Sequence, residues 1–128
     1  LADATKFRIV DFNVDRLFQA HETAAKLASE GMTVFGMGQG FLSMAAPMKD
    51  FERRLIGRKL HHGGNPILRF MAEGAAVSQD AANNLKFNKA DSQSKIDGLV
   101  ALVMSLDRVM RRENVTTSIY ESRGVLSF

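Results

Sequence analysis

Two aspartates lie at positions where a metal ion could be bound. Asp97 is at the front of the apolar segment SKIDGLVALVMSL, residues 94–106, and Asp15 follows the strand-like segment FRIVDFNV, residues 7–14. Carboxylate oxygens are the ligands that Mg²⁺ and Mn²⁺ prefer in proteins. Two metal ions that clamp a phosphodiester need about three or four such ligands. The chain offers two well-placed carboxylates for that chemistry, with Asp11 within the strand as a fallback.

Both aspartates also have a purely structural interpretation. Ser94 and Asp97 form an S-x-x-D pattern, which is typical of a helix N-cap followed by an acidic residue in the first turn. Asp15 could equally cap a helix that begins at Arg16. The residue pattern leaves the metal-binding and helix-capping interpretations open.

Three other segments contain residues that could bind a ligand. Lys95 lies two residues before Asp97, where its ammonium could neutralise a phosphate, and it could equally be a surface residue. The adjacent histidines His61 and His62 do not share a helix face, and no H-E-x-x-H pattern accompanies them. The segment GMGQG, residues 36–40, lacks the spacing and the lysine of a phosphate-binding P-loop, so ATP hydrolysis is not supported.

Composition indicates one soluble globular domain. The chain has 128 residues, a net charge of +3 and no cysteine, which excludes disulfides, cysteine-ligated zinc and thiol catalysis. The mild basic excess is compatible with a polyanionic partner. No apolar run approaches the roughly 20 residues needed to cross a bilayer, so we expect a cytoplasmic protein without a membrane partner.

The hydrophobic pattern predicts alternating strands and helices, hence an α/β fold. Short strands are expected at 7–14 and 32–37, and a hairpin is expected around an Asn-rich turn at 80–84. Helices are expected from about residue 16 to Gly31, from Pro47 to Ile56, from Pro66 onward after an Asn65 cap, and from Lys95 to Glu113, with a terminal strand possible within 116–128.

Several motifs occur in a characteristic order. HGGNPILRFM at 62–71 is followed by K-x-[DN]-K at 86–89, then by S-x-x-[KR]-IDG at 92–98 and by SIYESRG at 118–124. In this order the chain resembles the C-terminal part of the large terminase subunit of tailed double-stranded DNA phages. The resemblance implies a ribonuclease H-like nuclease domain that uses Mg²⁺ or Mn²⁺ to cut concatemeric DNA during genome packaging.

The resemblance also implies roles for individual residues. Asp97 falls on the aspartate of the IDG motif, a late metal ligand at a helix start, and Asp15 falls on a strand-end aspartate of the family. Val14 and Leu17 replace the aromatic residues that usually flank that strand-end position. Lys95 is expected to contact phosphate, and Lys86 and Lys89 of the hairpin are expected to contact DNA.

By the same resemblance, residues 1–128 are the C-terminal part of the nuclease domain, and the first strands are missing. The family's first catalytic aspartate and the packaging ATPase domain would then lie upstream, and the isolated chain would be weakly active or inactive. The implied partners are double-stranded DNA and, for the full protein, the ATPase domain, the small terminase subunit and the portal. Self-association through an exposed sheet edge is expected as well. The alternative is a non-catalytic prophage remnant or packaging module that binds DNA or a partner protein.

Overall fold

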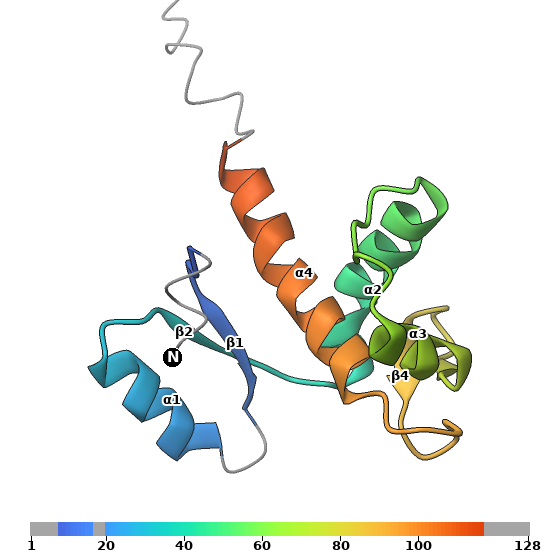
Figure 1. The fold of residues 1–128 in the computed structure, drawn as a ribbon, viewed down its shortest axis with the longest axis horizontal. Coiled ribbons are helices and arrows are strands. Elements are labelled where there is room, and N and C mark those ends of the chain that lie inside the picture. Colours follow the sequence, from blue (N-terminus) through green and yellow to red (C-terminus); the bar gives the residue numbers. More distant parts are fainter. Residues whose placement is uncertain (1–7, 17–19, 117–128) are drawn as a thin grey trace, which may run out of the picture.

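The computed structural model describes residues 8–16 and 20–116 (Figure 1). Within these ranges, strands and helices follow one another in the order β1, α1, β2, α2, α3, β3, β4, α4, so the α/β prediction is confirmed. The predicted terminal strand lies outside the described residues. None of the described helices is both long and apolar enough to span a membrane.

The first unit is a parallel strand pair with a helical crossover. β1 (Phe12–Asp15) pairs with β2 (Val34–Met37) in a register that sets Asp15 opposite Met37, and α1 (Ala20–Ser29) connects them. Parallel strands need such a crossover because the end of the first strand and the start of the second lie at opposite ends of the pair. α1 is followed by Gly31 with φ +82°, the left-handed residue predicted to end this helix.

The second helix begins earlier than the sequence predicts. α2 spans Phe41–Ile56 after an extended Gly40, so the expectation that it starts at Pro47 is wrong. Pro47 lies inside the helix and is buried. Burial of its side chain offsets the loss of stability from the backbone hydrogen bond that proline cannot donate. The predicted end is confirmed, because the N–H of Gly57 donates to the carbonyl of Arg53 at 3.0 Å.

Helix α3 (Pro66–Glu73) forms as predicted. Asn65 caps it, because its Oδ1 accepts from the N–H groups of Ile67 and Leu68 at 2.9 and 3.1 Å. The fixed φ of proline suits the first helical position that Pro66 occupies.

The predicted hairpin is also confirmed. β3 (Ala76–Gln79) and β4 (Leu85–Asn88) pair antiparallel around a turn that contains Asn83 at φ +61°. Asp80 Oδ1 stabilises this turn by accepting from the N–H groups of Ala82 and Asn84 at 2.9 and 2.8 Å.

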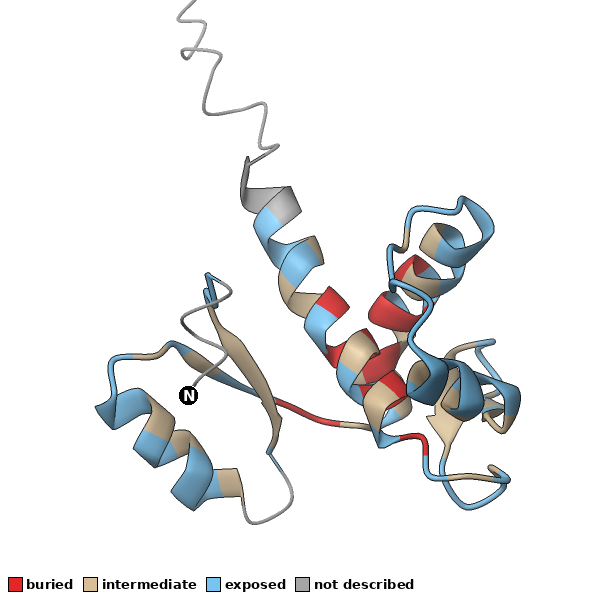
Figure 2. Cartoon of the chain, viewed as in Figure 1, coloured by how far each residue is buried: buried red, intermediate tan, exposed pale blue. Residues whose placement is uncertain are grey.

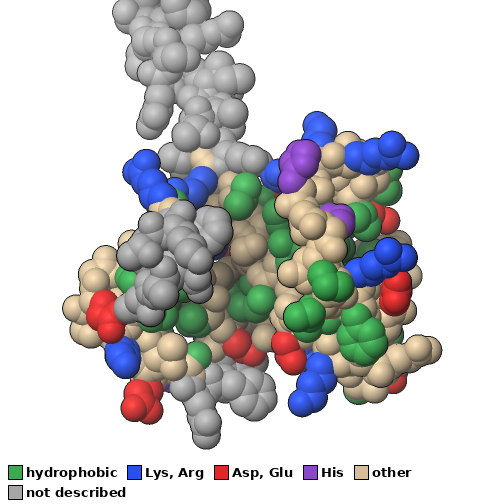
Figure 3. Space-filling view, in the orientation of Figure 1, with side chains coloured by type: hydrophobic (Ala, Val, Ile, Leu, Met, Phe, Trp, Pro, Cys, Tyr) green, Lys and Arg blue, Asp and Glu red, His purple; other side chains and the backbone are tan. Residues whose placement is uncertain are grey.

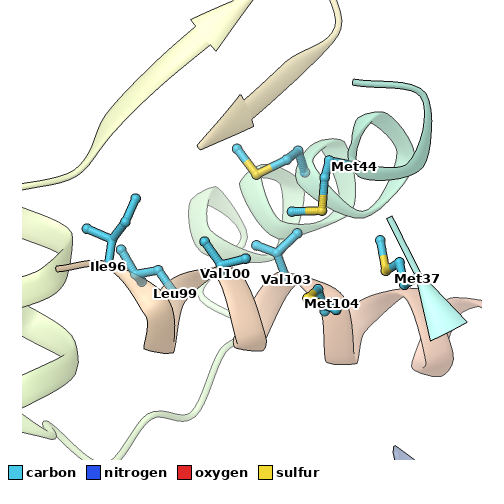
Figure 4. Packing of buried hydrophobic residues seen from close by; sticks show 8 residues of the cluster. Met37, Met44, Ile96, Leu99, Val100, Val103 and Met104 are labelled. Atoms are coloured by element: carbon cyan, nitrogen blue, oxygen red, sulfur yellow. The ribbon is translucent and has the colours of Figure 1, made fainter. Parts of the chain in front are cut away.

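The core lies where α2 faces α4 (Asp97–Thr116), and α1 contributes no buried residue to it (Figure 2). Figure 4 shows Val100 and Val103 of α4 on the side that faces Met44 of α2, and Met104 beside Met37 at the end of β2. The buried cluster comprises Met37, Met44, Met48, Ile96, Leu99, Val100, Val103 and Met104. The core therefore joins the end of β2 to the beginning of α4.

Polar contacts attach the β1–β2 pair and the residue before β1 to α4. The side-chain amide of Asn13 donates to the carbonyl of Met104 at 2.8 Å. Asp11 pairs with Arg108 and Arg112 of α4 at 3.3 and 3.2 Å, and the Arg108 guanidinium lies 3.4 Å from the centre of the Phe35 ring. These contacts hold the strand pair against the helix.

Asp50 is a buried acid that should make stability depend on pH. Its side chain is 6% exposed and binds Arg53 and Arg54, with the Arg54 contact at 2.6 Å. Burial acts to raise the pKa of Asp50, but hydrogen bonds and charge from the two arginines outweigh it and lower the pKa below the ordinary value.

We therefore expect the stabilising contribution of Asp50 to be complete above the carboxyl pKa of the unfolded chain, about 3.9, and to be lost as pH falls through the lower folded value. At neutral pH, Asp50→Asn should lower the free energy of unfolding by about 1–3 kcal/mol, because the charged acceptor of the two arginines becomes a neutral one that accepts weaker hydrogen bonds. Urea unfolding of both proteins between pH 7 and pH 2.5 measures this difference. A constant difference across that range would contradict the assignment.

Candidate metal and DNA site

The two aspartates singled out by the sequence come to the same end of the molecule. Asp15 ends β1 and Asp97 begins α4, and Figure 1 shows both of these element ends on the lower side of the view. Asp15 lies opposite Met37 in the strand pair, and Met37 belongs to the core cluster that also contains Ile96. The core thus connects the end of the strand to the start of the helix.

The side chain of Asp15 lies on the face of β1 that meets α4. Alternate residues of a strand share a face, and Asn13, two positions earlier, reaches the carbonyl of Met104 on that helix. Asp15 is half-buried there. The Oδ1 atom of Asn13 is buried without a hydrogen-bond donor among the described residues, so a polar acceptor remains open on this face of β1.

Asp97 has a close cationic partner. Its side chain is 68% exposed, and its Oδ1 accepts from the Lys89 ammonium at 2.7 Å. The hydrogen bond from Lys89, together with the charges of Lys89 and Lys95, lowers the pKa of Asp97 below its ordinary value. Asp97 is therefore ionised at neutral pH, as a cation ligand must be.

The capping interpretation of Ser94 is wrong. α4 begins at Asp97, and the Oγ of Ser94 is buried without a hydrogen-bond partner among the described residues. Ser94 instead packs on Gly74, where an added Cβ would lie 2.5 Å from that Oγ. The second half of the interpretation is confirmed, because Asp97 lies in the first helical turn, where a negative charge is favourable.

The glycine that follows Asp97 has a packing role. A Cβ on Gly98 would lie 2.8 Å from the sulfur of Met71 on α3. The absence of a side chain therefore lets α3 approach the first turn of α4.

The donors suit a hard cation in kind but remain few in number. No group of three or more His, Asp or Glu side chains within residues 8–16 and 20–116 is arranged to hold a metal ion. The fallback residue Asp11 is paired with Arg108 and Arg112. Asp15 and Asp97 are the two predicted ligands that the fold brings to this end of the molecule.

The three lysines of interest have different surroundings. Lys89 binds Asp97, and Lys86 lies over the Phe41 ring with its nitrogen 4.8 Å from the ring centre. Lys95 is exposed and lines a small hollow of about 340 Å³ together with Lys89 and Asp97. Two of the three ammonium groups thus lie at the start of α4.

A larger hollow of about 1020 Å³ lies elsewhere, among α2, α3, α4 and the hairpin, and its lining includes neither Asp15 nor Asp97. Hydrophobic side chains reach the surface beside it over α3, as Figure 3 shows, where Ile67 and Phe70 are 65% and 62% exposed. The histidines His61 and His62 line this hollow. The polar site and the apolar hollow are separate features.

Comparison with known proteins identifies the family. Residues 4–113 match the sequence model of the family described as "Terminase large subunit, endonuclease domain". The chain is 32% identical over 115 residues to Protein YmfN of Escherichia coli (strain K12), a match that covers 86% of this chain and 25% of that protein. It is 38% identical over 69 residues to the large terminase subunit of Enterobacteria phage HK97, covering 54% of this chain and 14% of that protein.

The fold is also similar to a solved structure. The crystal structure of the HK97 bacteriophage large terminase superposes with a TM-score of 0.71 at 29% identity, over 82% of this chain and 23% of that one. The chain thus spans a quarter or less of the length of these relatives. By the family match over residues 4–113, the chain belongs to the family of terminase large-subunit endonuclease domains.

Proposed function

We propose that this chain is part of the nuclease domain of a phage or prophage terminase large subunit, with a ribonuclease H-like architecture. In the complete protein this domain would cut concatemeric double-stranded DNA during genome packaging. The observation that carries the proposal is that a member of this family has Asp15 and Asp97 at the same end of the molecule. A strand-end carboxylate and a helix-start carboxylate suit a divalent-metal nuclease.

Asp15 and Asp97 would each give oxygen ligands to Mg²⁺ or Mn²⁺. A bound ion of this kind supplies an activated water and stabilises charge on the phosphate. Two carboxylates are fewer than a two-metal nuclease requires, and we assign the remaining ligands to regions of the longer relatives that this chain does not span. The isolated chain should accordingly cut DNA weakly or not at all.

DNA contact would fall to Lys86, Lys89 and Lys95. Lys89 and Lys95 lie beside Asp97, which suits them to bind a phosphate next to the cleaved bond. In the complete protein the domain would act with a packaging ATPase domain, a small terminase subunit and a portal in the host-cell cytoplasm. Self-association through an edge of the β1–β2 pair is a further part of this proposal.

The direct test is a chimera in which this chain replaces its matched segment of the HK97 large terminase. We expect the folded chimera to nick plasmid DNA with Mg²⁺ or Mn²⁺, and we expect the chain alone to give little or no product. Chelation of the metal with EDTA should stop the reaction. A correctly folded chimera that leaves plasmid intact at every metal concentration would contradict the proposal.

One observation favours a second function, a non-catalytic module that binds DNA or a partner protein. The described residues contain no cluster of three or more potential metal ligands. If the chimera is inactive but still binds DNA with an affinity that falls as salt rises, this second function becomes the better account.

A further inference from the structure

The ion pair between Lys89 and Asp97 joins the end of β4 to the start of α4. Lys89 directly follows β4, and Asp97 begins α4 eight positions later. The Lys89 nitrogen lies 2.7 Å from Asp97 Oδ1, and the two side chains are 46% and 68% exposed. Both groups are therefore accessible to solvent and to ligands.

The loop between these residues is held in place by the β3 side of the hairpin. The N–H of Ala76 donates to Ser92 Oγ at 3.0 Å, and the N–H of Gln93 donates to the carbonyl of Gly74 at 2.9 Å. The middle of the loop between the two charged residues is thus anchored. A change in the ion pair then requires only movement of the lysine side chain, whose four-carbon stem is flexible.

Because a divalent cation on Asp97 and an ammonium on the same carboxylate repel each other, they compete for its oxygens. We propose that Lys89 is a resident counter-ion of Asp97 that a divalent cation must displace, and that the displaced ammonium then binds a DNA phosphate. This inference rests on the proposed function and adds a coupling between metal binding and DNA binding at the same site.

The surroundings give the displaced ammonium a place to bind an anion. Lys89, Lys95 and Asp97 line one hollow of about 340 Å³ at the start of α4. With a divalent cation on Asp97, both lysines and the cation carry positive charge toward this hollow. A phosphate group is the anion that such a set of charges favours in a DNA-binding protein.

The test is a Mn²⁺ titration of the whole 128-residue chain, followed by paramagnetic broadening of the backbone amides around Asp97. Lys89→Met keeps the aliphatic stem and removes the competing ammonium. Lys59→Met is the matched control, because Lys59 is exposed in the loop after α2 and its loss changes the net charge equally. We expect Lys89→Met to bind Mn²⁺ about fivefold more tightly, the upper end for release of one exposed ion pair, and Lys59→Met to match the unsubstituted chain.

A second measurement follows the released group. Addition of diamagnetic Mg²⁺ to the unsubstituted chain should shift the side-chain ammonium resonance of Lys89 and leave that of Lys59 unchanged. Equal Mn²⁺ affinities in all three proteins would contradict the displacement of Lys89 by the cation, and so would an unmoved Lys89 resonance at saturating Mg²⁺. Neither result would contradict the proposed metal site itself. Absence of broadening near Asp97 in every protein would overturn both the displacement and the metal site.

Discussion

Ile96→Ala should lower the free energy of unfolding by about 2–5 kcal/mol, the range for truncation of a large aliphatic side chain in a packed core. Ile96 is 1% exposed and lies in the cluster between α2 and α4. It also directly precedes Asp97, the first residue of α4. Loss of this side chain leaves a cavity beside the start of α4, and urea unfolding followed by circular dichroism measures the loss of stability.

Ile67→Ala provides the matched control. Ile67 is an isoleucine on α3 that is 65% exposed, so its truncation removes little buried surface. Surface substitutions of this kind usually change stability by about 0.5 kcal/mol or less. Equal destabilisation by the two substitutions would mean that the α2–α4 cluster is not the core of the chain.

The second large effect concerns catalysis. Asp97→Asn in the active chimera should reduce plasmid cleavage by about 100-fold or more, because even the outer-shell partners of metal ligands contribute about 10- to 100-fold. Asparagine keeps the size of the side chain and removes the charge that a divalent cation requires. The initial rate of nicking at saturating Mg²⁺ measures the loss.

Asp91→Asn is the control for this change. Asp91 is an exposed acid in the same loop between β4 and α4, and it accepts a hydrogen bond from Asn88 that an asparagine can also accept. Cleavage should be preserved in this variant. Equal rates for Asp97→Asn and the unsubstituted chimera would remove Asp97 from the catalytic site and favour a merely structural role at the helix start.

Much of the fold could be predicted because local signals and tertiary packing agree. Asn65 followed by Pro66 predicts the helix start that the structure shows, and Asp80 with the asparagines after it predicts the turn of the hairpin. The apolar stripe of α4 likewise becomes the buried cluster. In each case the residue satisfies a backbone group or a core position within its own element.

The errors occur where tertiary contacts override local preference. Pro47 predicts a helix start. Its side chain is instead buried in the core, six residues after the first residue of α2. Ser94 predicts a helix cap. Its hydroxyl is instead buried against Gly74, which precedes the hairpin in the sequence, whereas Ser94 follows it. Nothing in the adjacent residues of either position indicates these contacts.

In the candidate site, too, the sequence predicts local features but not tertiary contacts. The sequence selects Asp15 from a strand end and Asp97 from a helix start, and the structure brings both element ends to the lower side of the molecule in Figure 1. The partner of Asp97 was missed, because Lys95 is nearer in sequence and Lys89 reaches the carboxylate only through the path of the hairpin. Basic residues along α4 instead pair within the protein, as Arg108 does with Asp11.

We propose that Asp15 and Asp97 contribute to one divalent-cation site. The most direct test of this proposal is a Mn²⁺ titration of the unsubstituted chain, with the backbone amides of β1 and of the first turn of α4 followed by NMR. We expect the amides around Asp15 and Asp97 to broaden together, at the same Mn²⁺ concentrations and before any others. Broadening around only one of the two aspartates, or around neither, would contradict a shared site.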